Sequence, residues 1–178
     1  MKISMALNSK SIDLALRELE KYEDRIQKCA EEIVRILSLR GYDVAYTIMA
    51  GNVYSGETLD SLTIVEESPT KHILTAGSKA LLFFEFGAGV QGVGHPLAGD
   101  FGMGAGTYPP TNPEHPHWND PDGWWYPTDD PGLIVRHGKD GQGYGHTHGN
   151  PPRMPMYMAA KTIRDELLDV VKEVINGD

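Results

Sequence analysis

The sequence has little cysteine, a shortage of basic residues and no long apolar run. The single cysteine, Cys29, excludes an intrachain disulfide framework and a cysteine-rich zinc module. The N-terminal residues lack the charged n-region and apolar h-region of a signal peptide, and Lys79 and Glu85 interrupt the most apolar stretch, so we expect neither a signal peptide nor a membrane span. Sixteen Lys and Arg against 25 Asp and Glu give a formal charge of -9, which argues against nonspecific binding to nucleic acid or anionic membrane. These features predict a soluble, acidic protein of the cytosol, or of an assembly formed there.

The composition is uneven along the 178 residues. Residues 87–150 contain 15 of the 20 glycines, 8 of the 12 prolines and 6 of the 7 histidines. The two flanks have the composition of an ordinary folded protein. We therefore predict a single domain over residues 1–178, with a core from 1–86 and 151–178 and a long inserted loop at 87–150.

The first flank opens with the pattern of a long amphipathic helix. Ser9 or Ser11 can cap its start, and Gly41 is a natural stop. A helix of roughly 30 residues would be about 45 Å long, more than a small sheet covers. We expect part of its apolar stripe to pack against something else. The stripe consists of Ile12, Leu16, Leu19, Ile26, Ile33 and Leu37.

The residues after Gly41 predict a change of structure. Alternating apolar residues over 42–49 indicate a strand, and further strands are expected at 62–65 and 72–77, joined by short turns. A short apolar helix is expected over 80–86 and a final helix from Pro155. The predicted fold is α+β: a long N-terminal helix and a C-terminal helix packed on a small antiparallel sheet, with a long Gly/Pro/His-rich inserted loop.

Three local sequences, in this order, resemble segments of one known family. Residues 55–62 (SGETLDSL) resemble its TG-x-L-x-x-S-I segment, residues 83–89 (FFEFGAG) its Y-x-E-F-G-T segment, and residues 152–160 (PRMPMYMAA) its Q-P-F-x-x-P-A segment. The family is the HK97 gp10-like tail-component family of tailed bacteriophages. The chain departs from the pattern at Ala88, where threonine is usual, and at Met156, where phenylalanine is common. Residues 123–128 (GWWYPT) resemble a GWYYPT-like stretch in members from phages of Gram-positive bacteria.

The resemblance implies a structural protein of the virion neck, in a phage or a prophage, made in the cytoplasm of the bacterial host. Such a tail-completion or head-tail joining component forms a ring of its own copies and contacts other neck and tail proteins. DNA would pass through the lumen without sequence-specific binding. The residues that we take as candidates for interaction come from the motifs and the inserted loop: Gly56, Leu59, Ser61, Glu85, Phe86, Gly87, Trp118, Trp124, Trp125, Tyr126, Arg153 and Pro155.

Glu85 is a lone carboxylate within an apolar run. One interpretation is that it faces outward from a short helix. The other is a hydrogen bond or ion pair between subunits or domains, because a buried carboxylate is costly without a partner. A catalytic acid would need a second polar group nearby in the sequence, and none is evident.

The histidines of the inserted loop allow a second hypothesis. His115 and His117, like His146 and His148, form H-x-H pairs, and residues i and i+2 of an extended chain point the same way. A metal-dependent hydrolase could use these pairs together with loop aspartates. The spacing matches no motif of known mechanism, and a loop this rich in histidine produces such pairs by composition alone. We therefore expect neither a metal nor a cofactor, and no enzymatic activity.

The aromatic residues of the loop allow a third hypothesis. A platform for stacking sugars, as in a carbohydrate-binding module, could be formed by Trp118, Trp124, Trp125, Tyr126 and Tyr144. They could equally anchor the loop to its own domain or bury at an interface, where Trp and Tyr contribute most per residue. We favour the anchor or interface. Cys29 is expected to be a small buried residue of the first helix.

Overall fold

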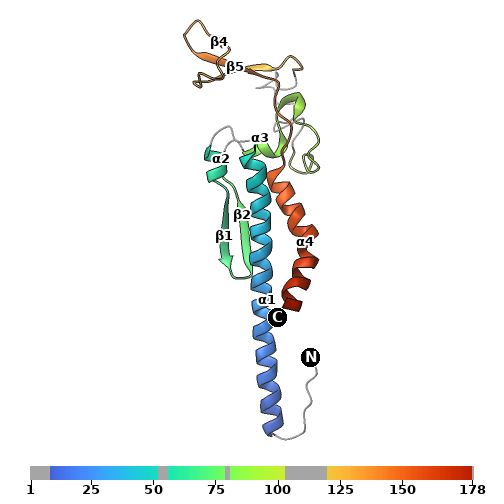
Figure 1. Cartoon of the computed structure of the whole chain (residues 1–178). Coiled ribbons are helices and arrows are strands. Elements are labelled where there is room, and N and C mark those ends of the chain that lie inside the picture. Colours follow the sequence, from blue (N-terminus) through green and yellow to red (C-terminus); the bar gives the residue numbers. More distant parts are fainter. Residues whose placement is uncertain (1–8, 52–55, 79–80, 103–119, 178) are drawn as a thin grey trace.

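A computed structural model describes residues 9–51, 56–78, 81–102 and 120–177. Two long helices and a hairpin form an elongated body, and a small separate sheet lies beyond one end of it (Figure 1). Helix α1 spans Ser9–Ala50 and helix α4 spans Pro155–Gly177. None of the helices in the described residues is both long and apolar enough to cross a membrane. The predicted α+β fold with a long N-terminal helix and a C-terminal helix is confirmed.

Helix α1 continues past the predicted stop at Gly41, and the strand predicted at 42–49 is wrong. The residues of this region that are buried are Gly41, Ala45 and Met49, which recur every four residues as on one face of a helix. Gly41 lies close against α4: a Cβ atom there would be 2.6 Å from Cδ1 of Ile163, so the isoleucine side chain would have to shift. The alternation of Tyr42, Val44 and their neighbours therefore gave a wrong prediction, because tertiary packing decides the structure of residues 42–49.

Helix α4 packs antiparallel against the C-terminal half of α1 (Figure 1). Arg40 of α1 reaches across to two carboxylates of α4, Glu166 at 2.7 Å and Glu173 at 3.1 Å. The hydrogen bond to Glu166 raises the pKa of the Arg40 guanidinium above its ordinary value. These pairs border the seam between the two helices.

The sheet beside α1 is a hairpin of two antiparallel strands, β1 (Thr63–Ser68) and β2 (Lys71–Thr75). Both strands were predicted, and one of the expected short turns joins them at Pro69 and Thr70. One face of the hairpin packs on α1, where the hydroxyl of Ser38 lies 2.9 Å from Nδ1 of His72. The sheet has two strands instead of the predicted three because residues 42–49 belong to α1.

The core lies where the C-terminal end of α1, the start of the hairpin and the first turns of α4 meet. Two short helices, α2 (Gly56–Asp60) and α3 (Leu81–Phe86), flank this region, and α3 confirms the helix predicted at 80–86. The buried centre of the core consists of Ala45, Met49, Leu62 and Ala159, surrounded by partly buried Tyr42, Leu59, Leu74, Ala76, Leu81 and Met156.

The described part of residues 87–150 has more regular structure than a loop. A single-turn helix η1 (Gly89–Gln91) follows α3. Three short strands, β3 (Trp124–Pro127), β4 (Arg136–His137) and β5 (Gly143–Thr147), then form an antiparallel sheet in the order β3-β5-β4. We call it the distal sheet, because it lies beyond the C-terminal end of α1 (Figure 1). The prediction of an inserted loop is wrong for these strands, whose short, glycine-interrupted runs gave little periodicity to read.

Most of the N-terminal half of α1 lies outside this packing (Figure 1). From Ser9 to Lys28, all of which the structure describes, Ala15 is the only buried residue. Four apolar residues of the predicted stripe are 40–52% exposed here: Ile12, Leu16, Leu19 and Ile26. The expectation that α1 is longer than its sheet can cover is confirmed.

Candidate functional site

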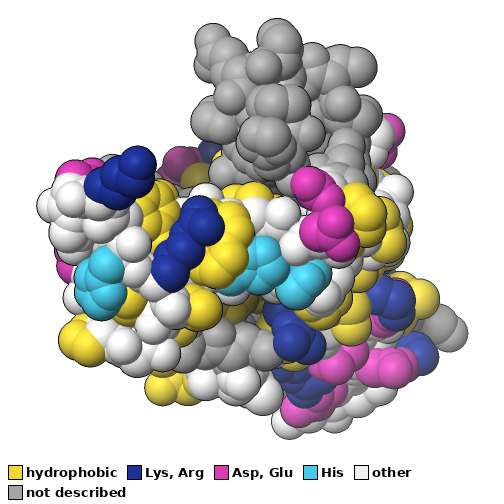
Figure 2. Space-filling view, turned by 90° about the horizontal axis from the view of Figure 1, so that it is seen from above, with side chains coloured by type: hydrophobic (Ala, Val, Ile, Leu, Met, Phe, Trp, Pro, Cys, Tyr) yellow, Lys and Arg dark blue, Asp and Glu magenta, His cyan; other side chains and the backbone are white. Residues whose placement is uncertain are grey.

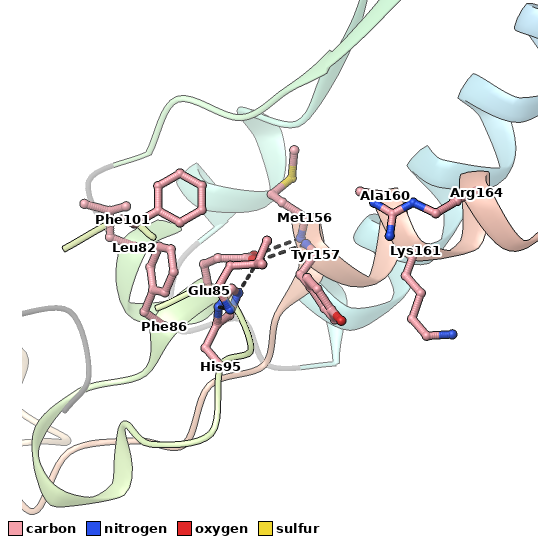
Figure 3. Close-up of a pocket in the computed structure, with 11 residues that line it drawn as sticks. Leu82, Glu85, Phe86, His95, Phe101, Met156, Tyr157, Ala160, Lys161 and Arg164 are labelled. Atoms are coloured by element: carbon pink, nitrogen blue, oxygen red, sulfur yellow. Dashed lines mark hydrogen bonds and ion pairs between the residues drawn. The ribbon is translucent and has the colours of Figure 1, made fainter. Parts of the chain in front are cut away.

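Glu85, near the end of α3, is buried at the N-terminus of α4 (Figure 3). Its Oε2 accepts a hydrogen bond from the backbone N–H of Met156, and its Oε1 accepts one from the N–H of Tyr157, each at 2.9 Å. The first N–H groups of a helix have no acceptor within the helix, and they form the positive end of its dipole. The Glu85 carboxylate therefore caps α4 from a segment that is distant in the sequence.

His95 completes the surroundings of this carboxylate. Its Nε2 lies 3.1 Å from Oε1 of Glu85, and its Nδ1 accepts a hydrogen bond from the N–H of Leu97 at 3.1 Å. Because Nδ1 is an acceptor, the ring proton is on Nε2 and is donated to Glu85. The imidazole also packs against the rings of Phe86 and Tyr157, with centroids 4.4 and 5.4 Å away. The outward-facing interpretation of Glu85 is wrong: the carboxylate is buried and bonded within its own chain.

The second and third segments that carry the family resemblance meet at this point. The carbonyl oxygen of Phe84 accepts hydrogen bonds from the N–H groups of Arg153 at 2.7 Å and Met154 at 3.2 Å. Pro155 is buried at the first position of α4, as predicted. The structure thus brings together five of the candidate residues, which we call the α3–α4 junction: Glu85, Phe86, Gly87, Arg153 and Pro155.

Gly87 is required where residues 87–150 leave the junction and return to it. Its φ is +76°, and an added Cβ would lie 2.6 Å from the carbonyl oxygen of Asn150 and 2.7 Å from the nitrogen of Pro152. Directly beside it, Ala88 and Asn150 exchange two backbone hydrogen bonds of 2.8 and 3.1 Å. The two ends of the inserted segment are therefore fastened to each other.

The first segment of the resemblance lies apart from Glu85. Gly56 begins α2, and Leu59 packs against the core. The hydroxyl of Ser61 donates a hydrogen bond to the carbonyl oxygen of Thr58 at 2.7 Å. Leu59 and Ser61 thus lie where α2 ends, before β1 begins, and they contact their own chain.

A cavity of about 450 Å³ opens beside the α3–α4 junction (Figure 3). Its wall is largely apolar, and it includes Phe86, Phe101 and Tyr157 as well as the Glu85–His95 pair. Lys161 and Arg164 of α4 line one side. Both oxygens of Glu85 are already engaged by donors, so the pair fixes the junction and presents little free acid or base to the cavity.

The aromatic residues of the distal sheet have two different surroundings. The ring of Trp124 lies against Gly89 of η1, where an added Cβ would be 2.6 Å from the indole. Trp125 is 40% exposed on the other face, with the guanidinium of Arg136 3.7 Å from its ring and the ring of His146 4.6 Å away. Figure 2 looks onto the end of the molecule that carries the distal sheet, and basic and histidine side chains lie there beside apolar ones. Tyr126 packs over Gly145 of the neighbouring strand. Trp124 thus contacts η1, outside the distal sheet, whereas Tyr126 packs within that sheet.

The structure describes one of the two histidine pairs, His146 and His148. His146 and His148 have ring centroids 5.0 Å apart in an edge-on contact. Within the described ranges, no three His, Cys, Asp or Glu side chains gather in a way that could hold a metal ion. His115, His117 and Trp118 lie outside the described residues. Cys29 is buried in α1, as predicted.

Comparison of the chain with protein-family models, with curated proteins and with solved structures found no match.

Sequence reasoning missed two residues of the junction, His95 and Asn150. The signal for a partner of Glu85 was the cost of burying a carboxylate, but nothing in the spacing selects the histidine ten residues later. Asn150 donates from its side chain to the carbonyl oxygen of Phe83 at 2.8 Å, across 67 residues. A contact between the two ends of an insertion has no local pattern from which to predict it.

Proposed function

We propose that the chain is a structural protein of the virion neck in a phage or prophage. It is a tail-completion or head-tail joining component that assembles with its own copies into a ring and binds other neck and tail proteins. The proposal begins from the three segments that resemble the HK97 gp10-like tail-component family. The α3–α4 junction supports it, because two of those segments form one hydrogen-bonded unit there.

The observation that carries the proposal is the uncovered apolar stripe on the N-terminal half of α1. Leu16, Leu19 and Ile26 are each about half exposed on a helix of 42 residues. Contiguous apolar surface on a soluble chain typically marks an interaction site. A subunit that buries this surface against neighbours fits an assembly protein better than an enzyme that acts alone.

The proposal is tested by deleting the coding sequence from the phage or prophage that carries it. We expect filled heads and finished tails that do not join, and infectious particles restored when the protein is supplied from a plasmid. A control plasmid carrying a chain truncated before α4 should not restore them. Normal joined particles in the deletion strain would contradict the proposed function.

A further inference from the structure

The apolar stripe of α1 continues beyond the part that α4 covers. Helix α1 is about 63 Å long and α4 about 35 Å, from their 42 and 23 residues at about 1.5 Å each. The stripe passes under α4 at Gly41 and Ala45, and Leu37 on the same face is also buried. It then continues in the same register to the exposed residues Ile12, Leu16, Leu19 and Ile26. The face of α1 that packs against α4 therefore continues, toward the N-terminus, as an exposed apolar face.

A second apolar row lies on the outer side of α4, away from α1. Leu168 is 69% exposed and Ile175 is 49% exposed, whereas Ala159 and Val170 on the opposite side are buried against the body. Leu168 and Ile175 are seven residues apart, with partly buried Val171 between them on the same side. Helix α4 thus has an apolar row on each of two faces, and its own chain uses one.

The charges beside the two open rows are opposite in sign. The 3.6-residue repeat places Glu23 between Leu19 and Ile26 in the α1 stripe, with Asp13 and Glu20 along its border. The bases of this half of α1, among them Lys10, Arg17, Lys21 and Lys28, fall on its back. The α4 row has Arg164 one turn before Leu168, together with Lys161 and Lys172. Asp165 and Asp169 also lie beside the α4 row, where they pair with these two lysines.

We propose that the N-terminal half of α1 docks on the outer face of α4 of a second copy of this chain. The α4 row, about 10 Å from Leu168 to Ile175, covers about half of the α1 row, which is about 21 Å from Ile12 to Ile26. The acidic border of α1 faces Arg164 and its neighbouring lysines. Because each copy carries both surfaces, the contact is head-to-tail and can repeat around a closed ring. This inference rests on the self-assembly proposed above and names the two surfaces that form it.

The test uses one blocking substitution on each surface of the full chain. Leu19→Asp blocks the α1 stripe, Leu168→Asp blocks the α4 row, and Leu14→Asp is the matched control, because Leu14 is 55% exposed on the opposite side of α1. All three side chains are exposed, so circular dichroism should show unchanged folding. Sedimentation velocity should show an oligomer for the unmodified chain and the control. Each blocked variant should self-associate about tenfold or more weakly.

Mixing the two blocked variants gives the sharpest outcome. Each retains the surface that the other has lost, so the mixture should form one-to-one pairs that grow no further. Continued assembly of either blocked variant alone, or a mixture that stays monomeric, would overturn the inference. So would an unmodified chain that is monomeric at concentrations of tens of micromolar. The presence of the protein in particles is measured separately, so the proposed function can survive each of these results.

Charge reversal tests the polar border of the same contact. Glu20→Lys with Glu23→Lys should weaken assembly, and so should Arg164→Glu with Lys172→Glu. The chain that carries all four changes again has opposite charges on the two surfaces, and we expect it to recover most of the lost association. A fourfold variant that is weaker than both double variants would contradict this pairing.

Discussion

The carboxylate of Glu85 accepts a hydrogen bond from the backbone N–H of Tyr157, 72 residues further along the chain, at a distance of 2.9 Å. This contact joins the end of α3 to the first turn of α4. Helix α4 in turn packs against α1, so the bond links the start of the inserted segment to the main helical seam. One buried side chain thereby sets where the inserted segment leaves the body.

Replacing Glu85 should destabilise the whole chain. Glu85→Ala leaves the N–H groups of Met156 and Tyr157 and the Nε2 of His95 without their acceptor, so we expect the free energy of unfolding to fall by about 3 kcal/mol. Glu85→Gln keeps one accepting oxygen and should lose less. Urea denaturation followed by circular dichroism measures both. An unchanged midpoint for Glu85→Ala would show that the cap contributes nothing.

A comparison of Gly87 with Gly141 separates the energetic cost of a positive φ from the cost of a close contact. Both have positive φ, +76° and +83°, so alanine at either position should cost about 1 kcal/mol in strain. An added Cβ at Gly141 meets nothing within 4 Å, whereas at Gly87 it meets backbone atoms of Asn150 and Pro152. We therefore expect Gly87→Ala to lower the free energy of unfolding by about 3 kcal/mol or more. Equal losses for the two variants would refute the close approach.

Trp124 and Trp125 should differ in how they hold the distal sheet. Trp124 contacts Gly89, whereas Trp125 is 40% exposed and contacts Arg136 and His146 of the sheet itself. Limited proteolysis of Trp124→Ala should cleave residues 120–150 faster than in the unmodified chain, with α1 and α4 still protected. Trp125→Ala is the matched control and should be cleaved more slowly than Trp124→Ala. The reverse order would show that Trp124 is not the anchor.

The hydrolase hypothesis makes a separate prediction about metal. Chelator-treated protein refilled with zinc and then desalted should retain much less than one ion per chain, by elemental analysis. No three potential ligands gather around His146 and His148 in the described residues, so replacing both histidines by alanine should leave the retained zinc unchanged. One tightly held ion per chain that is lost in the double variant would favour the hydrolase over the assembly protein.

The parts of the fold that could be predicted are those with local patterns. The start of α1, the hairpin of β1 and β2, and the beginning of α4 at Pro155 follow from caps, turns and periodicity. The end of α1 could not be predicted, because Gly41 reads as a stop until Ile163 is known to lie against it. The alternation at 42–49 fits a strand and a helix equally well over so short a range.

The candidate site could be predicted only as separate pieces. Glu85 and Pro155 were recognised, each from its own segment, but the contact between their segments depends on the path of the chain between them. His95 lies in a region with several histidines, and its burial distinguishes it from the others that the structure describes there, His137, His146 and His148. The exposed apolar stripe at Leu16 and Leu19, in contrast, could be predicted, because the expected helix is longer than a small sheet covers.

Gold labelling of the protein in purified particles tests the central proposal most directly. An epitope tag at the C-terminus, after α4, gives a label whose place on the particle can be seen by electron microscopy. We predict several labels per particle, all at the junction of head and tail, and none on capsid faces or along the tail. Purified infectious particles that carry no label, while the tagged protein is abundant in the lysate, would contradict a structural role in the neck.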